Sequence, residues 1–426
     1  MQNNTFKLLT EELGVSPEVL KLVNIAEEEI KDSFEELEDI KTYNQYKVLD
    51  VFRKCRITDM HFGWNTGYGY DDPGREALEK VYAQVFHTED AIVRPLIVNG
   101  THALTLTLTG ILRPGDEIVY CTGGPYDTLE EVIGIRGEAG TGSLKDFGVN
   151  YHQIEMKDGC VDGEKVAQYL KEHKEVKVVF LQRSKGYAIR KTLSAEEIGV
   201  TAKLCHEINP DVFVIVDNCY GEFCDEHEPT YYGADMIMGS LIKNPGGGMA
   251  ETGGYIAGTK KAVELCSYRL TCPGIGTECG ASLGQNKNMY KGLFYAPHTV
   301  CQSIKTAILA ARVYENLGYE TSPKSTEERH CIIQTISMKT REKLIKFCCG
   351  IQSGSPVDSF AAPEPYPMPG YAVDVIMAAG AFTQGSSIEL SADAPCTEPY
   401  TVYLQGGLTY ESGKIGILYA AMGTEE

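Results

Sequence analysis

The chain has 426 residues, 43% of them hydrophobic, which is enough to bury a large core in two or three domains. Its formal net charge of −20 disfavours nucleic acid and anionic membrane surfaces as partners, although a locally positive site could still bind a small anion. The sequence contains no run of about 18 apolar residues, so we expect no membrane span.

The cysteine pattern argues against a metal site and against disulfides. The 14 cysteines include no CxxC pair, so their spacing does not match that of a zinc site, and we expect no bound metal. The first residues, MQNNTFKLLTEELG, lack the basic start and apolar stretch of a secretory signal. We therefore expect reduced, mostly buried thiols in a cytoplasmic protein.

Residues 1–60 are expected to form a helical segment. Residues 27–55, EEEIKDSFEELEDIKTYNQYKVLDVFRKC, place apolar side chains at helical intervals beside a dense charged face. Residues 61–74, HFGWNTGYGYDDPG, alternate aromatics with glycines and indicate a loop. Because tyrosine phenols also serve binding sites, Tyr68 and Tyr70 are candidate site residues in this loop.

Residues 61–295 are expected to form an α/β domain. Short apolar strand patterns alternate with helical patterns, which favours a parallel sheet covered on both faces. The predicted helices are 75–86, 101–112 and 195–208, and the predicted strands are 91–98, 116–121, 176–182, 211–218 and 234–241.

Residues 296–426 are expected to form a smaller α+β domain. Residues 299–318, TVCQSIKTAILAARVYENLG, have helical spacing. Short strand patterns and the proline-rich stretch AAPEPYPMPGY at residues 361–371 follow this helix.

An anion site is possible where the strand pattern that ends at Val98 turns into a helix. Asn99, Gly100 and Thr101 form the turn, and free backbone N–H groups at a helix start suit a phosphate. Alone, this pattern is better explained as an ordinary helix cap, since it matches neither GxGxxG nor a Walker A loop.

Two further strand ends carry charged side chains. Asp217 closes an apolar run in VFVIVDNCYGEF, where an ionised carboxylate needs a cation or an N–H donor nearby. Ser240 and Lys243 follow the strand pattern ADMIMG, and an apolar setting would lower the pKa of the lysine and make its amine nucleophilic. A turn-capping aspartate and a solvated loop lysine are the ordinary alternatives.

The three features together predict a pyridoxal 5′-phosphate site. Ligands of open α/β sheets bind at the carboxyl ends of the strands. A phosphate-binding turn, a carboxylate for the pyridine nitrogen and a lysine for the Schiff base are the groups that this cofactor needs.

The ordered motifs resemble those of fold-type-I pyridoxal-phosphate enzymes of the Cys/Met-metabolism group, which includes cystathionine lyases and methionine γ-lyase. The chain most resembles the bacterial aluminium resistance or methionine γ-lyase-like proteins. The resemblance covers about Tyr68 to Gly258 well and the C-terminal third weakly. It is carried by the segments YGYDDPGREALEKVYAQVF, NGTHAL, VDNCYGEF and SLIK. It implies a large domain with a mostly parallel seven-stranded sheet and a small α+β domain.

The resemblance also implies roles for individual residues. Lys243 would be the Schiff-base lysine and Asp217 the partner of the pyridine nitrogen. Gly100 and Thr101 would donate N–H groups to the phosphate, and Ser240 would add a hydroxyl.

Tyr68 resembles the tyrosine that reaches the phosphate in a neighbouring subunit. The resemblance therefore implies a homo-oligomer, a dimer or a tetramer, with active sites at the subunit interface.

Several positions depart from the family pattern. Tyr70 replaces an arginine, for which Arg75 or another cation could substitute, and Ile242 replaces a threonine. Where the family has a tyrosine that stacks on the cofactor ring, this chain has Thr122. We therefore expect Tyr126 to stack on the cofactor and to act as an acid or base.

Arg183 is the candidate for binding the substrate carboxylate or the cofactor, with a surface or structural role as the alternative.

We expect a carbon–sulfur lyase that acts on a sulfur-containing amino acid, in the manner of cystathionine β-lyase or methionine γ-lyase. The alternatives are a pyridoxal-phosphate enzyme of another reaction type, namely an aldolase, racemase or transaminase, or a non-catalytic stress-response protein of the same fold. The expected partners are a small amino-acid substrate and further copies of the chain.

Overall fold

The computed structural model describes residues 3–368 and 373–425. The chain divides into two compact units, Tyr43–Pro297 (the large unit) and Met1–Thr42 with His298–Glu426 (the small unit). Residues 3–42 therefore belong to the same unit as the C-terminal residues and residues 43–60 to the large unit, whereas the sequence analysis set residues 1–60 apart. The end of the proline-rich stretch, residues 369–371, lies outside the described residues.

A seven-stranded sheet forms the centre of the large unit, in the order β1-β7-β6-β5-β4-β2-β3. The strands from β6 to β3 in this order pair in parallel, and β7 is antiparallel to both of its neighbours. This arrangement confirms the predicted mostly parallel sheet and fold class. The strands are β1 (Asp90–Arg94), β2 (Glu117–Tyr120), β3 (Asn150–Gln153), β4 (Val176–Gln182), β5 (Phe213–Asp217), β6 (Met236–Ser240) and β7 (Gly254–Gly258).

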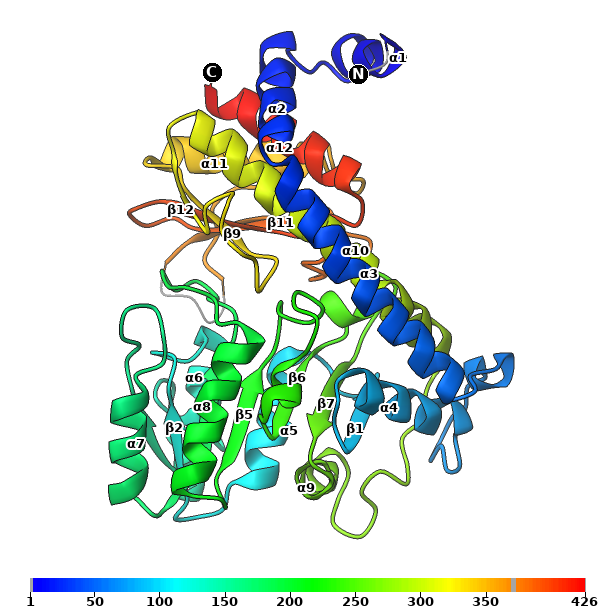
Figure 1. Cartoon of the computed structure of the whole chain (residues 1–426), viewed down its shortest axis with the longest axis vertical. Helices are drawn as coiled ribbons and strands as arrows, with labels where there is room; N and C mark the ends of the chain where they lie inside the picture. The colour runs from blue at the N-terminus through cyan, green and yellow to red at the C-terminus, as the bar shows by residue number, and fades with distance from the viewer. Residues whose placement is uncertain (1–2, 369–372, 426) are drawn as a thin grey trace. The chain divides into compact units, whose positions relative to one another are not determined.

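Helices cover both faces of this sheet; in Figure 1, α8 is drawn in front of it and α5 behind it. Strands β6 and β7 are buried along their whole length, as expected for a sheet that is covered on both sides. The helices are α4 (Pro73–Val85), α5 (Gly100–Ile111), α6 (Asp127–Ile133), α7 (Gly163–Glu172), α8 (Ala195–Ile208) and α9 (Lys260–Leu270). The core includes Ile92, Leu104, Ile118, Phe180, Ile215, Met238 and Ile256.

The sequence patterns located five of the seven strands. Strand β4 has the predicted bounds, whereas β1 ends at Arg94, before Pro95. Strands β3 and β7 were missed because NYHQ is polar and GYIAG contains two glycines, so neither has a β-branched apolar run.

The small unit contains a five-stranded antiparallel sheet, in the order β10-β11-β12-β9-β8. Helices α11 (Arg341–Ser353) and α12 (Tyr410–Glu425) pack closely against each other, and α11 also contacts β10 and β11. The strands are β8 (Glu320–Ser322), β9 (Gln334–Ser337), β10 (Val375–Ala378), β11 (Ser391–Pro395) and β12 (Thr401–Gln405).

The N-terminal part of the chain is helical. It contains α1 (Asn3–Lys7), a single π-helical turn (Leu8–Glu12) and α2 (Pro17–Glu29). Two long helices, α3 (Lys31–Lys54) and α10 (Asn286–Asn316), contain residues of both units.

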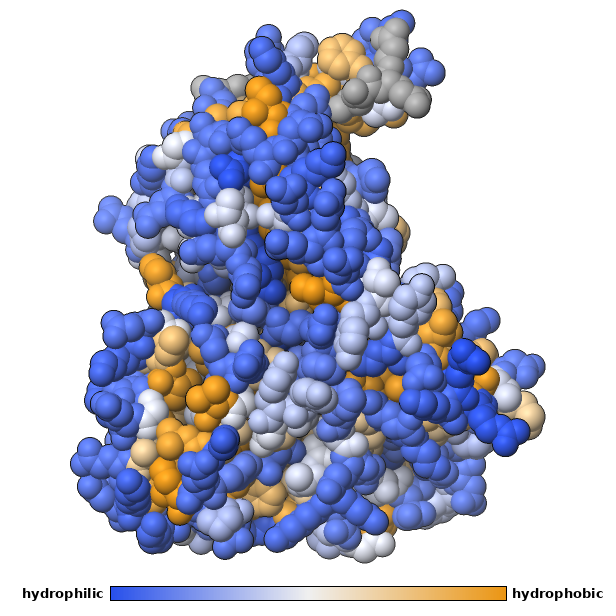
Figure 2. Space-filling view, in the orientation of Figure 1, coloured by the Kyte–Doolittle hydropathy of each residue, from blue (hydrophilic) through white to orange (hydrophobic). Residues whose placement is uncertain are grey.

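The surface agrees with the acidic, polar composition of the chain. Hydrophilic residues cover most of the face drawn in Figure 2, and hydrophobic residues gather there in small groups. Among the described residues, no helix is both long enough and apolar enough to cross a membrane.

Candidate active site

Three sequence-predicted residues meet at one edge of the large sheet. Asp217 is the last residue of β5 and Ser240 the last residue of β6, and these strands are parallel neighbours. Gly100 opens α5, which packs on β6. A Cβ atom on Gly100 would lie 3.5 Å from the Ser240 Cβ and 3.5 Å from the Cys219 Sγ. The first turn of α5 therefore faces the ends of β5 and β6.

This turn has the features of a phosphate cradle. The Asn99 side chain caps α5 by accepting a hydrogen bond of 2.8 Å from the His102 N–H. The first N–H groups of a helix have no partner within it, so those of Gly100 and Thr101 are available to an anion. The Thr101 hydroxyl lies 2.9 Å from that of Thr128, so Thr101 offers its backbone rather than its side chain.

Ser240 supplies an unusual buried hydroxyl beside the cradle. Its side chain is 1% exposed, and its Oγ has no hydrogen-bond partner among the described residues. An unpartnered buried polar atom costs free energy unless a ligand completes its hydrogen bonds.

Asp217 is a buried carboxylate with partners that favour its charge. Its Oδ1 accepts a hydrogen bond of 3.1 Å from the Cys219 N–H, and the side chain is 7% exposed. Burial raises the pKa of Asp217, and the positive charge of Lys243 opposes this effect. The two residues are therefore electrostatic partners.

Lys243 is half-buried, with its Nζ 4.0 Å from the centre of the Tyr220 ring. Burial disfavours its charged form, but the neighbouring acidic groups of Cys219, Tyr220 and Asp217 outweigh burial and raise its pKa above the usual value. The prediction that burial lowers the pKa of Lys243 is therefore wrong for the chain without a bound cofactor. The sequence analysis considered an apolar setting, whereas the structure gives the ammonium a carboxylate and an aromatic ring face.

Tyr126 precedes α6 at the same side of the sheet. A Cβ atom on Gly186 would lie 3.4 Å from the Tyr126 ring and 3.0 Å from the Gln182 Nε2. Gln182 ends β4 and lies opposite Asp217 in the β4–β5 pairing. Tyr126 is thus placed near the predicted site, and its stacking and acid–base roles stay predictions.

Arg183 is fully buried and binds groups of the chain itself. Its guanidinium donates hydrogen bonds to the Asn218 Oδ1 at 2.8 Å, the Glu228 Oε2 at 2.9 Å and the Asp225 Oδ2 at 2.5 Å. Burial opposes the charge of Arg183, but Asp225 and Glu228 raise its pKa. These contacts favour the structural alternative over substrate binding.

Tyr68 lies in an exposed aromatic loop. Its side chain is 74% exposed and stacks on Tyr70, with ring centroids 5.4 Å apart. Arg75 fixes this loop by donating hydrogen bonds to the Gly69 and Gly280 carbonyls. Arg75 is 3% exposed, and its guanidinium hydrogen bonds go to backbone carbonyls, so Arg75 does not form an open anion site.

The sequence analysis missed several residues of the site. Tyr220 adopts a left-handed backbone with φ of 73° and places its ring beneath Lys243. Arg190 is a second missed residue, because its positive charge acts to lower the pKa of Asp217. Its guanidinium donates a hydrogen bond of 2.8 Å to the Gln182 carbonyl. Glu222 accepts a hydrogen bond of 2.8 Å from the Tyr255 hydroxyl, and burial raises its pKa to about 8.

The segment VDNCYGEF held a signal for two of these residues. Tyr220 and Glu222 follow Asp217 within five residues, and a glutamate in such an apolar and aromatic stretch is unusual unless it is buried for a reason. No sequence spacing connects Arg190 to Asp217.

The residues present fit pyridoxal phosphate. The cradle of Gly100, Thr101 and Ser240 offers two N–H groups and an unpartnered hydroxyl to a phosphate. Asp217 offers a buried carboxylate and Lys243 an amine beside it. This donor set matches the anionic, basic and aldehyde groups of the cofactor.

Comparison with known proteins agrees with this assignment. The family model described as methionine gamma-lyase matches residues 19–424. The uncharacterised protein YnbB of Bacillus subtilis is 51% identical over 395 residues, which cover 92% of this chain and 93% of YnbB.

Solved structures give the same result. The crystal structure of a carbon–sulfur lyase involved in aluminium resistance from Clostridium novyi NT superposes with a TM-score of 0.95 at 50% identity, and the match covers 99% of both chains. The pyridoxal-phosphate-dependent protein YhfS of Escherichia coli shares the fold at 14% identity, with a TM-score of 0.60 over 91% of this chain and 96% of YhfS. These matches confirm the resemblance seen in the motifs. The chain belongs to the methionine gamma-lyase family of pyridoxal-phosphate-dependent carbon–sulfur lyases.

Proposed function

We propose that the protein cleaves the carbon–sulfur bond of a sulfur-containing amino acid of the cystathionine or methionine type, using pyridoxal phosphate. The observation that carries this proposal is the meeting of Lys243, Asp217 and the Gly100–Ser240 cradle at one sheet edge. The C. novyi relative, described as a carbon–sulfur lyase, supports the choice of bond.

The chain would hold the cofactor at three points. The N–H groups of Gly100 and Thr101 and the hydroxyl of Ser240 bind the phosphate, with the N-terminal dipole of α5 adding attraction. The Asp217 carboxylate would hold the pyridine nitrogen, and the Lys243 amine would hold the aldehyde group. When bound, the cofactor supplies a ring that accepts negative charge from the substrate Cα.

Lys243 and Tyr126 carry the proton transfers in this proposal. The free amine of Lys243 takes the proton from the substrate Cα, and the Tyr220 ring stabilises the ammonium that results. Tyr126 would pack beside the cofactor and would donate a proton to the leaving sulfur. The carbon–sulfur bond breaks with its electron pair on sulfur, and with the uptake of one water the products are a thiol, a keto acid and ammonia.

The active form is proposed to be a homo-oligomer. Four large residues of the loop region around Tyr68 are strongly exposed, which is unusual for side chains of this size. They are Met60, Trp64, Tyr68 and Tyr70. The family resemblance implies a role for Tyr68 at the phosphate of a neighbouring subunit, and burial of this loop region between copies would then complete each site.

An assay of the holoenzyme with cystathionine, methionine, cysteine and threonine tests the reaction type. We expect keto acid and ammonia from at least one of the three sulfur amino acids. Lys243→Ala should lower this rate by on the order of a thousandfold, because the chain loses its proton acceptor.

Lys177 is the matched control, since its Nζ also lies over a ring, 5.2 Å from the centre of Phe213. Lys177→Ala should keep full activity. Cleavage of threonine to glycine and acetaldehyde, racemisation or transamination without sulfur release would contradict the proposal, and so would a fully active Lys243→Ala protein.

A further inference from the structure

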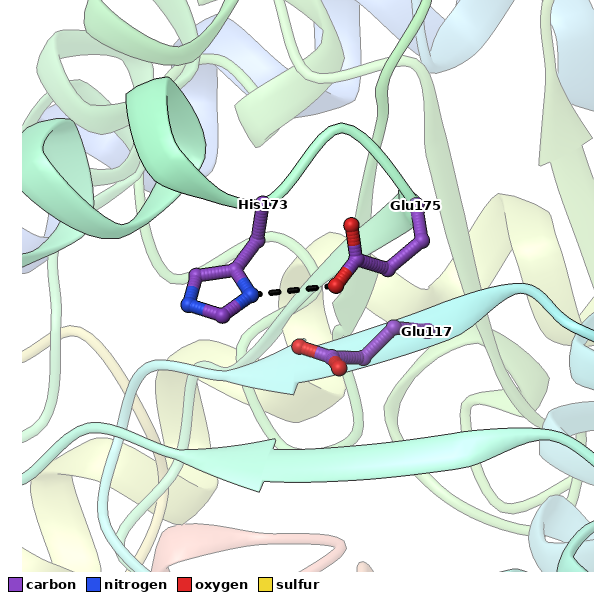
Figure 3. A group of neighbouring side chains, drawn as sticks. All are labelled: Glu117, His173 and Glu175. Atoms are coloured by element: carbon purple, nitrogen blue, oxygen red, sulfur yellow. Dashed lines mark hydrogen bonds and ion pairs between the residues drawn. The ribbon is translucent and has the colours of Figure 1, made fainter.

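Three potential metal ligands converge at the opposite edge of the large sheet. Glu117 is the first residue of β2, His173 follows α7, and Glu175 precedes β4. One ligand atom of each side chain lies within 4.8 Å of those of the other two. Figure 3 shows the imidazole and both carboxylates turned toward a common point.

Neighbouring residues hold these side chains in place. The His173 Nδ1 lies 3.0 Å from the Glu175 Oε1. The His173 ring stacks on Tyr169, and Tyr169 stacks on His152, each with ring centroids 3.9 Å apart. The backbone N–H of Glu117 donates to the Glu175 carbonyl at 2.9 Å. The imidazole and both carboxylates are therefore oriented before any ion binds.

Glu117 gives the strongest indication of a ligand. Its carboxylate is 8% exposed, and Oε1 accepts a hydrogen bond of 2.6 Å from the Tyr169 hydroxyl. The other oxygen has no hydrogen-bond donor in the described part of the chain. A hydrogen bond from a neighbouring group to a coordinating carboxylate is typical of metal sites, and Tyr169 is placed to supply it.

The charges and donor types define the ion. Two carboxylates so close together repel each other, and a cation between them removes this cost. One imidazole nitrogen and two carboxylate oxygens suit Zn²⁺, Co²⁺ or Ni²⁺, whereas Mg²⁺ and Ca²⁺ prefer sites made of oxygen alone. Solvent can complete the coordination, because the His173 and Glu175 side chains are 36% and 44% exposed.

We propose that Glu117, His173 and Glu175 bind one divalent transition-metal ion. Cysteine spacing cannot reveal this site, because none of its ligands is a cysteine and Glu117 lies more than 50 residues before the other two. The ion would tie the end of α7 to the starts of β2 and β4. Because Asp217 and Ser240 lie at the carboxyl ends of the strands, this site is separate from the proposed lyase site.

Titration of the holoenzyme with Co²⁺, followed by calorimetry and visible absorption, tests the proposal. We expect one saturable site per chain. The bound Co²⁺ should show the visible absorption of an ion with nitrogen and oxygen ligands, rather than the charge-transfer band of an ion bound to thiolates such as Cys160 or Cys272. Glu117→Gln and His173→Phe should each weaken binding at least tenfold, since both remove a ligand. Phe keeps a ring for stacking on Tyr169, so the local fold is preserved.

His206 provides the matched control, because its Nε2 pairs at 2.9 Å with one carboxylate, that of Asp235. His206→Ala should bind Co²⁺ with unchanged affinity, and all three variants should bind pyridoxal phosphate normally. The proposal would be overturned if Co²⁺ showed no saturable binding, or if Glu117→Gln and His173→Phe bound Co²⁺ as tightly as the unmodified protein. It would also be overturned if a thiolate band were the main signal.

Discussion

Lys243 and Asp217 form a pair in which each favours the charge of the other. Asp217 is buried, so its carboxylate needs a positive group nearby, and the Lys243 ammonium supplies it. In the holoenzyme, a protonated ring nitrogen of the cofactor would replace the Lys243 ammonium as the positive partner of Asp217. The pair therefore keeps the site stable before the cofactor binds, but it also keeps the lysine protonated.

The raised pKa of Lys243 predicts that cofactor attachment to the apoenzyme accelerates with pH. Only the neutral amine attacks an aldehyde, and a raised pKa leaves it a small fraction that grows about tenfold per pH unit below the pKa. Stopped-flow absorbance at about pH 6.5 to 9 measures the rate of attachment. A rate that is flat or falls over this range would show that the neutral amine is not limiting.

At the level of elements, the glycines of the loop after β6 let its backbone pack closely against neighbouring backbone. A Cβ atom on Gly246 would lie 1.6 Å from the Leu241 carbonyl oxygen, and one on Gly247 would lie 2.5 Å from that of Gly292 on α10. The loop packs on its own strand end and on α10, and this contact fixes the backbone that carries Lys243.

Gly246→Ala should therefore destabilise the protein although it adds a single methyl group. Overpacking of this kind costs about 1–3 kcal/mol of the free energy of unfolding. Chemical denaturation measures the loss. Gly124→Ala is the control, because the nearest atom to its added Cβ would be 3.9 Å away, and it should change the stability little. Equal stability of the two variants would contradict the claim that Gly246 is needed for close packing of the loop backbone.

The elements show what the sequence could and could not predict. Strands with β-branched apolar runs, such as β4 and β5, were located because such runs fit a buried sheet. Asp217 and Lys243 could be predicted because they lie at the end of such a strand or within three residues of it, and the phosphate turn because it begins a helix after an apolar run. The polar strand β3 and the position of Tyr220 depend on tertiary pairing and on a left-handed backbone, which no local pattern encodes.

Arg183 shows the same limit for charged side chains. An arginine at a strand end looks the same in sequence whether it binds a substrate or an internal carboxylate. Glu228, which binds its guanidinium, lies 45 residues further along the chain. Only the fold reveals this pairing.

At the scale of the whole molecule, the proposed shared site predicts complementation between two inactive variants. Tyr68→Ala should lose activity by weakening the phosphate site of the neighbouring subunit, while Lys243→Ala loses its own. Co-expression should restore activity, because a mixed oligomer contains one site with both residues intact. Activity is measured against that of each variant alone.

Tyr46→Ala is the control for this experiment, since Tyr46 is also exposed, at 68%, but lies on α3. It should be active by itself. A fully active Tyr68→Ala enzyme, or no gain on co-expression, would contradict a site shared between subunits.

The central claim is that Lys243 holds the cofactor covalently at the edge formed by β5 and β6. Reduction of the holoenzyme with borohydride, followed by proteolysis and mass spectrometry, tests it most directly. The account predicts that the reduced cofactor is found on the peptide containing Lys243. Attachment to any other lysine, or no attached cofactor in an enzyme supplied with pyridoxal phosphate, would contradict it.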